Sequence, residues 1–76
     1  MQLKLLAFAQ AREQLGFGEQ SVECAEEETP RAILRRVAPG FNPGPVRVAV
    51  DRRFADWDQP VGKAFELAVI PPVSGG

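Results

Sequence analysis

The chain has 76 residues, of which 45% are hydrophobic and 25% are charged, and its net charge is −1 at pH 7. A chain of this length predicts a single small domain, which buries only about 60% of its unfolded surface. Nine basic residues nearly balance ten acidic ones, which argues against nucleic-acid binding through bulk charge. With one cysteine and no histidine, the chain cannot form an internal disulfide, a Cys/His metal cluster or an imidazole-based catalytic site.

No stretch of the sequence approaches the ~20 apolar residues that a membrane-spanning helix needs. The apolar run at residues 5–9 is too short for the hydrophobic core of a signal peptide, and Lys4 precedes it directly. We therefore expect a cytoplasmic domain that has neither a membrane nor a nucleic acid as a partner.

The first elements are predicted from alternation and helix-stop signals. Residues 2–8 favour a strand, and residues 9–15 favour a short helix that ends at Gly16. Residues 19–24 alternate polar and apolar side chains, which predicts a second strand. The inward side chains of the two strands are expected to be Leu3, Leu5, Ala7, Val22 and Cys24. Cys24 is therefore interpreted as a small core residue rather than a nucleophile.

The main helix is predicted over residues 30–38. Thr29 can cap its first amides, Pro30 suits the first helical position, and the glutamates at 26–28 are interpreted as a solvated cap. Pro39 and Gly40 end the helix. Its buried face is expected to carry Ile33, Leu34 and Val37.

The second half of the chain is predicted to complete the sheet. Strands are expected at residues 46–50, 54–57 and 65–70, with a turn at 51–53 and the prolines at 71 and 72 as the end of the last strand. In the third strand Val46, Val48 and Val50 face inward. One helix against such a sheet is an α+β roll. If its first and last strands are neighbours, it is a β-grasp fold, but periodicity alone gives only the class.

Three segments resemble the molybdopterin synthase small-subunit family: FAQAREQLG at residues 8–16, AVD at 49–51 and PPVSGG at 71–76. The chain differs from that family at Asp51, where asparagine is common. It also reads GKAFE at 62–66, where the family has an acidic, glycine-containing turn. The resemblance implies a ubiquitin-like β-grasp domain over residues 1–70, followed by a flexible Gly-Gly tail at 71–76.

The resemblance also implies a function for the last glycine. A ubiquitin-activating-type adenylyltransferase would adenylate Gly76, and a sulfur donor enzyme would convert it to a thiocarboxylate (1-thioglycine). The sulfur would then enter cyclic pyranopterin monophosphate in the active site of a large catalytic subunit, which forms the molybdopterin dithiolene. No cofactor would be bound permanently, and ATP would be used by the activating partner. The small subunit would therefore donate sulfur, while the large subunit would supply the catalytic groups.

The tail sequence suits insertion into another protein. Pro71 and Pro72 fix φ and stiffen the exit from the sheet, whereas Gly75 and Gly76 have no Cβ and can pass a narrow channel. At ~3.3 Å per residue, the chain after Ile70 reaches about 20 Å. The expected partner-binding residues are Phe8, Phe54, Ile70, Pro71, Pro72, Val73, Ser74 and Gly75.

Strand parity predicts an apolar patch on the outer face of the sheet. If Leu3 and Leu5 face the helix, then Leu6, Phe8, Ala68 and Ile70 point outward, and Phe54 can extend the group. Such a patch favours a protein interface, the alternative being partial cover by the helix and loops. Arg47, Arg52 and Arg53 are expected to be solvated, with rim contacts to an acidic partner as the alternative. Trp57 is interpreted as packing at the margin of the core.

Two related functions share the Gly-Gly end. A sulfur carrier of the thiamin pathway has the same fold and ending, although the Pro-Pro-Val-Ser before the glycines favours the molybdenum pathway. A ubiquitin-like modifier would be joined to target lysines through Gly76. A third class, an interaction module with an accidental ending, has the least support.

Overall fold

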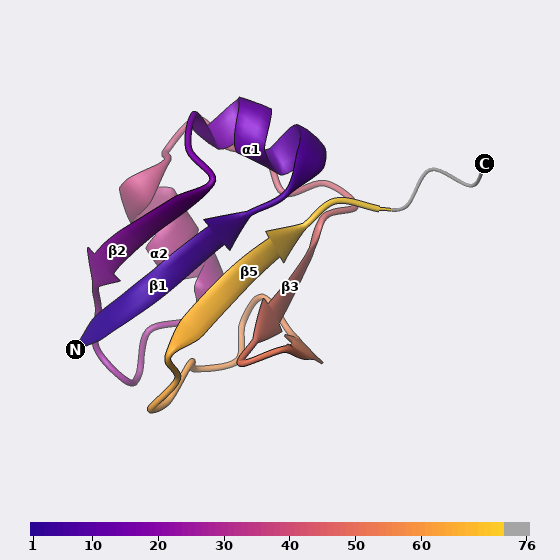
Figure 1. Ribbon diagram of the computed structural model, residues 1–76. Coiled ribbons are helices and arrows are strands. Elements are labelled where there is room, and N and C mark those ends of the chain that lie inside the picture. Colours follow the sequence, from indigo (N-terminus) through magenta and orange to yellow (C-terminus); the bar gives the residue numbers. More distant parts are fainter. Residues whose placement is uncertain (73–76) are drawn as a thin grey trace.

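The computed structural model describes residues 1–72, which form a five-stranded sheet with helix α2 across one face (Figure 1). The strand order is β2-β1-β5-β3-β4. β1 and β5 are parallel, and the other neighbours are antiparallel. The elements are β1 (Gln2–Ala7), α1 (Ala9–Leu15), β2 (Glu19–Glu23), α2 (Pro30–Val37), β3 (Arg47–Val50), β4 (Arg53–Ala55) and β5 (Glu66–Ile70). The first and last strands are neighbours, as a β-grasp fold requires.

The core lies between the sheet and α2. Strand parity is as predicted, because the β1 side chains of Leu3 and Leu5 are fully buried and the alternate residue Lys4 is exposed. Each large apolar side chain buried in this way stabilises the fold by about 1.5–3 kcal/mol. The largest fully buried side chains are Leu3, Leu5, Pro30, Ile33, Val48, Leu67 and Val69.

The structure also tests the predicted packing of Cys24 and Trp57. Cys24 is 5% exposed and belongs to the core cluster, as expected. Trp57 is half-buried against that cluster, and its Nε1–H donates to the carbonyl oxygen of Val46 at 3.0 Å. Both observations confirm the predicted packing roles of these residues.

Helix α2 begins as the sequence predicts. The Oγ1 of Thr29 accepts a hydrogen bond from the amide of Ala32 at 3.2 Å, and Pro30 is the first helical residue. Glu28 does not lie in the first turn. Its carboxylate accepts from the amide of Ala25 at 3.0 Å and from the Arg36 guanidinium at 3.0 and 3.1 Å. The bond from Ala25, followed by Arg36, lowers the pKa of Glu28.

Some element boundaries differ from the prediction by one or two residues. β1 ends at Ala7 because Phe8, with φ −120° and ψ 150°, caps the start of α1. The returning strand is Arg53–Ala55 instead of 54–57. It begins earlier because the tight turn before it is short, with left-handed φ values of 49° at Asp51 and 70° at Arg52. Gly16 ends α1 with a φ of 84°, as its position predicts.

Asp51 also ties this turn to the start of β5. Its Oδ1 accepts hydrogen bonds from the amides of Phe65 at 2.9 Å and Glu66 at 3.0 Å. In return, the Asp51 amide donates to the Glu66 carbonyl at 3.0 Å. The amide oxygen of an asparagine could accept the same two bonds. Aspartate therefore fits a position where the resembling family commonly has asparagine.

No helix in the described part of the chain has the length and apolar character needed to cross a membrane.

Candidate functional site

An apolar hollow lies on the outer face of the sheet, opposite α2. Its centre is one cross-strand row, in which Leu6 pairs with Ala68, Ala68 with Ala49, and Ala49 with Phe54. The two alanines are only 8% and 5% exposed, and the larger Leu6 and Phe54 lie at the two ends of the row. Small side chains between large ones leave a depression of about 350 Å³. We call this feature the outer hollow; its full lining is Leu6, Phe8, Ala49, Arg52, Phe54, Glu66, Ala68 and Ile70.

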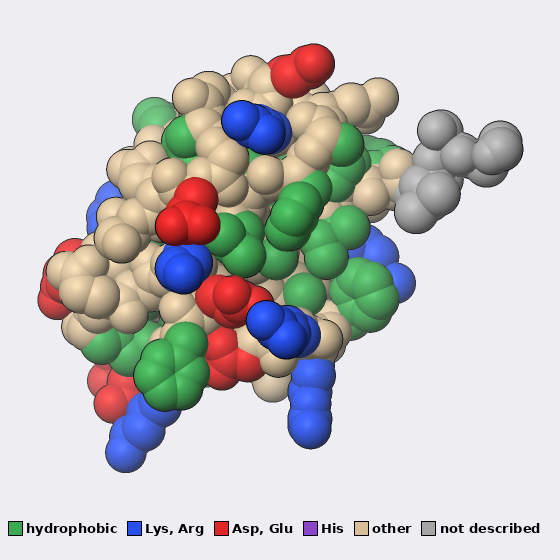
Figure 2. Space-filling view, in the orientation of Figure 1, with side chains coloured by type: hydrophobic (Ala, Val, Ile, Leu, Met, Phe, Trp, Pro, Cys, Tyr) green, Lys and Arg blue, Asp and Glu red, His purple; other side chains and the backbone are tan. Residues whose placement is uncertain are grey.

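A second row lies nearer the end of β5. Ile70 pairs with Arg47 of β3, and the amide of Phe8 donates to the neighbouring Val69 carbonyl at 3.4 Å. Phe8 is 50% exposed and Phe54 is 59% exposed, which is unusual for side chains of this size. Figure 2 shows the hydrophobic side chains gathered over this face. Pro71 follows Ile70 directly, so the C-terminal segment leaves the sheet at the margin of the outer hollow.

Charged groups form part of the rim. The Cζ of Arg47 lies 3.8 Å from the centroid of the Phe54 ring, so the guanidinium lies over the exposed aromatic side chain. At the other end of the hollow, the Arg52 Nε lies 3.6 Å from Glu66 Oε1. Among residues 1–72, no carboxylate lies within 4.0 Å of the Arg47 guanidinium. Within residues 1–72, the rim therefore holds the Arg52–Glu66 ion pair and the Arg47 guanidinium, which lies over an aromatic ring.

The structure brings together the predicted interface residues that it describes. Phe8, Phe54 and Ile70 all line the outer hollow, and Pro71 and Pro72 continue from it. Leu6 and Ala68 also line it, as parity predicts. The predicted Val73, Ser74, Gly75 and Gly76 lie outside the described residues.

The sequence pattern did not identify two lining residues, Ala49 and Glu66, and it gave Arg52 only as an alternative rim residue. Ala49 could have been found, because the alternation that places Val48 inward places Ala49 outward. The positions of Arg52 and Glu66 depend on how the β3–β4 turn sits against β5, which the residue pattern does not contain.

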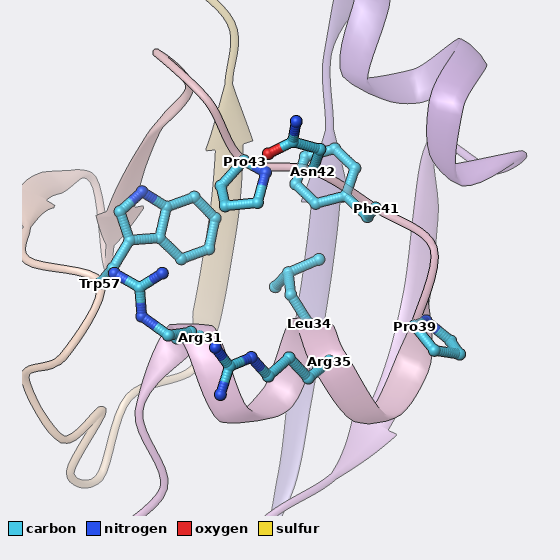
Figure 3. A pocket seen from close by; sticks show the side chains of 8 residues that line it. All are labelled: Arg31, Leu34, Arg35, Pro39, Phe41, Asn42, Pro43 and Trp57. Carbon is cyan, nitrogen blue, oxygen red and sulfur yellow. The ribbon is translucent and has the colours of Figure 1, made fainter.

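A second cleft, of about 250 Å³, lies between α2 and the segment that follows it (Figure 3). Arg31 donates to both Asp58 carboxylate oxygens at 2.8 and 3.3 Å, and its Cζ lies 5.9 Å from the Trp57 ring centroid. The hydrogen bond from Arg31 is the main cause of the lowered pKa of Asp58. Arg31 thus attaches α2 to the loop after β4. The outer hollow, whose large apolar side chains remain exposed, is the stronger candidate for binding a protein.

The thiol of Cys24 is not part of the outer hollow. Burial, followed by the nearby Glu28, raises its pKa, so little thiolate forms near neutral pH. No cluster of three or more histidine, cysteine, aspartate or glutamate side chains suited to a metal ion occurs within residues 1–72.

A mixed sheet with adjacent first and last strands and a helix across one face defines a ubiquitin-like β-grasp domain. The model of the ThiS family matches residues 5–76, and the chain belongs to the ThiS family.

Solved structures share this fold. A putative molybdopterin converting factor subunit 1 from Pyrococcus furiosus is 23% identical, with a TM-score of 0.74 over 96% of this chain and 99% of the other. SAMP1 from Haloferax volcanii is 22% identical, with a TM-score of 0.76 over the whole of both chains. A complex of subunits 1 and 2 of molybdopterin-converting factor from Helicobacter pylori matches at 19% identity and a TM-score of 0.66, again over 100% of both chains.

Proposed function

We propose that this protein is a sulfur carrier that acts as the small subunit of a molybdopterin synthase. The observation that carries the proposal is the position of the outer hollow, whose margin is the point where the segment Pro71–Gly76 leaves the sheet. A partner that binds the hollow can receive the last glycines in its own active site. Membership of the ThiS family supports a sulfur carrier in general, and the likeness to a molybdopterin converting factor subunit is the reason for proposing the molybdenum pathway.

The first reaction would activate the carboxylate of Gly76. A ubiquitin-activating-type adenylyltransferase binds the protein and ATP, and a carboxylate oxygen attacks the α-phosphorus. Pyrophosphate leaves, and the product is an acyl-adenylate. A sulfur donor enzyme then delivers sulfur at the oxidation level of hydrosulfide to the carbonyl carbon. AMP leaves, and Gly76 carries a thiocarboxylate.

The second reaction would transfer this sulfur. In the active site of the large subunit, the thiocarboxylate sulfur attacks a carbon of cyclic pyranopterin monophosphate, and the bond from that carbon to its oxygen breaks. Water then attacks the carbonyl carbon of Gly76, the bond between this carbon and sulfur breaks, and the carboxylate is restored while the sulfur stays on the pterin. A second thiocarboxylate-carrying chain supplies the second sulfur of the dithiolene in the same way. The large subunit supplies the catalytic groups. A two-subunit partnership is supported by the likeness to the Helicobacter pylori structure, which is a complex of subunits 1 and 2.

The folded domain would position the tail for both reactions. Apolar docking through the outer hollow holds the domain, and the two prolines, which have fixed φ and no amide donors, direct the chain away from the sheet. At ~3.3 Å per residue, the segment after Ile70 can reach about 20 Å into a partner.

Intact-mass spectrometry tests the proposal directly. The protein is incubated with ATP, the activating enzyme and the sulfur donor of the same organism. We expect a mass gain equal to the difference between sulfur and oxygen, located at Gly76 by fragmentation. Removal of Gly76 should abolish the gain and leave the Tm unchanged, because the deleted residue lies beyond β5. Cys24→Ser should keep the gain; a gain that follows Cys24 would contradict the proposal.

A ubiquitin-like modifier is the second candidate. It is favoured by the likeness to SAMP1, the small archaeal modifier protein 1 of Haloferax volcanii. It shares the adenylation step but ends in an isopeptide bond between Gly76 and a lysine of another protein. A thiamin-pathway carrier would share the thiocarboxylate as well. Adding the large subunit and the pterin precursor separates these functions, because only the proposed small subunit yields the dithiolene product.

A further inference from the structure

Arg47 lies on the rim of the outer hollow, close to the start of the C-terminal segment. It pairs with Ile70 across β3 and β5, so it lies in the row that borders the start of the C-terminal segment. Its guanidinium Cζ lies 3.8 Å from the Phe54 ring centroid. A planar guanidinium stacked on an aromatic ring keeps its edge N–H donors available for a carboxylate. The Phe54 ring thus holds Arg47 in place, while its N–H donors remain free to form an ion pair with a carboxylate.

Any partner that covers Ile70 and Phe54 also covers Arg47, because the three side chains are neighbours. Removing a guanidinium from water without a counter-charge costs several kcal/mol. Residues 1–72 provide no carboxylate within 4.0 Å of it. Glu66, the acidic residue of the outer hollow, lies at the far end of β5, about 13 Å away at ~3.3 Å per residue, and faces Arg52.

We infer that the partner of the outer hollow is a protein surface that combines an apolar projection with an aspartate or glutamate placed against Arg47. The apolar projection fills the depression above Ala49 and Ala68, and the carboxylate pairs with the guanidinium that Phe54 supports. The identification of that partner as the large subunit rests on the proposed function. A purely apolar surface would be rejected, because it would bury Arg47 unpaired.

Arg47 pairs with Ile70, the last residue before the C-terminal segment. The ion pair with the large subunit would therefore act as a selectivity contact at the start of that segment.

Titration of the large subunit from the same organism tests the inference, with affinity measured at low and high salt. Arg47→Met keeps an unbranched apolar side chain over Phe54 but removes the charge. We expect it to weaken binding about tenfold or more and to reduce the salt dependence of the affinity. Arg47→Lys should lie between wild type and Arg47→Met, because it restores the charge without the planar fork.

Arg53→Met is the matched control. Arg53 is exposed on β4 and precedes Phe54, so its side chain points away from the outer hollow while the change in charge is the same. It should bind like wild type. Equal affinities and salt slopes for Arg47→Met and Arg53→Met would refute the proposed ion pair but would leave the proposed function standing. If the wild-type protein neither binds the large subunit nor yields the dithiolene product, the proposed function fails, and this inference fails with it.

Discussion

Replacing Asp51 tests how the docking face is held in shape. Asp51→Ala removes the acceptor of two amide hydrogen bonds, from Phe65 and Glu66, which contribute about 1 kcal/mol each at this exposed position. It also leaves alanine at a φ of 49°, which costs about 1 kcal/mol more. We expect a loss of about 3 kcal/mol in the free energy of unfolding. Asp51→Gly, which avoids the steric cost, should lose about 2 kcal/mol. Asp51→Asn keeps the acceptor and should lose less than about 1 kcal/mol.

Urea unfolding provides the measurement. Trp57 is the single tryptophan and is half-buried against the core, so its fluorescence reports unfolding, with circular dichroism as a second probe. The order of stability should be wild type, Asp51→Asn, Asp51→Gly and Asp51→Ala. An Asp51→Gly variant as stable as wild type would refute the role of the two hydrogen bonds. An Asp51→Asn variant as unstable as Asp51→Ala would show that charge, and not acceptor geometry, decides.

Three further predictions concern acid stability, thiol reactivity and docking. The pKa of Glu28 is lowered in the folded state, so the unfolded state binds more protons as the pH falls below about 5, and stability is lost there. Glu28→Gln should flatten this acid limb in urea titrations between pH 5 and pH 3; an unchanged slope would exclude Glu28 as its source. The buried Cys24 thiol, whose pKa is raised, should react with a disulfide reagent at least about tenfold more slowly in the native protein than in urea, and equal rates would contradict its burial. Phe8→Asp should leave the circular dichroism spectrum unchanged but weaken binding to the large subunit by about 2 kcal/mol; unchanged affinity would remove Phe8 from the interface.

Much of the fold follows from local sequence signals. Alternation placed Leu3 and Leu5 in the core, and Thr29 with Pro30 located the start of α2. These signals are predictable because they depend on side-chain period and capping chemistry within a few residues. The same parity rule predicted the apolar outer face, which the structure confirms for the described lining residues.

The remaining features depend on strand register, which the pattern of one strand does not contain. Arg47 lies over Phe54 only because Ala49 pairs with Phe54 across the two strands. Asp51 reaches the Phe65 amide only because β3 is antiparallel to β5. Such contacts join residues separated by a turn or a loop. The proposed carboxylate that pairs with Arg47 cannot be predicted from this sequence at all, because it belongs to another protein.

The central position of β5 has a consequence for synthesis on the ribosome. β5 lies between β1 and β3, and Lys4 of the first strand pairs with Glu66 of the last. The first strand therefore lacks its parallel neighbour until residues 66–70 have left the exit tunnel. A nascent chain that stops earlier has neither the middle of the sheet nor the floor formed by Ala68. The outer hollow thus forms only after almost the whole domain has been translated. A truncated chain therefore lacks the hollow and cannot bind a partner through it.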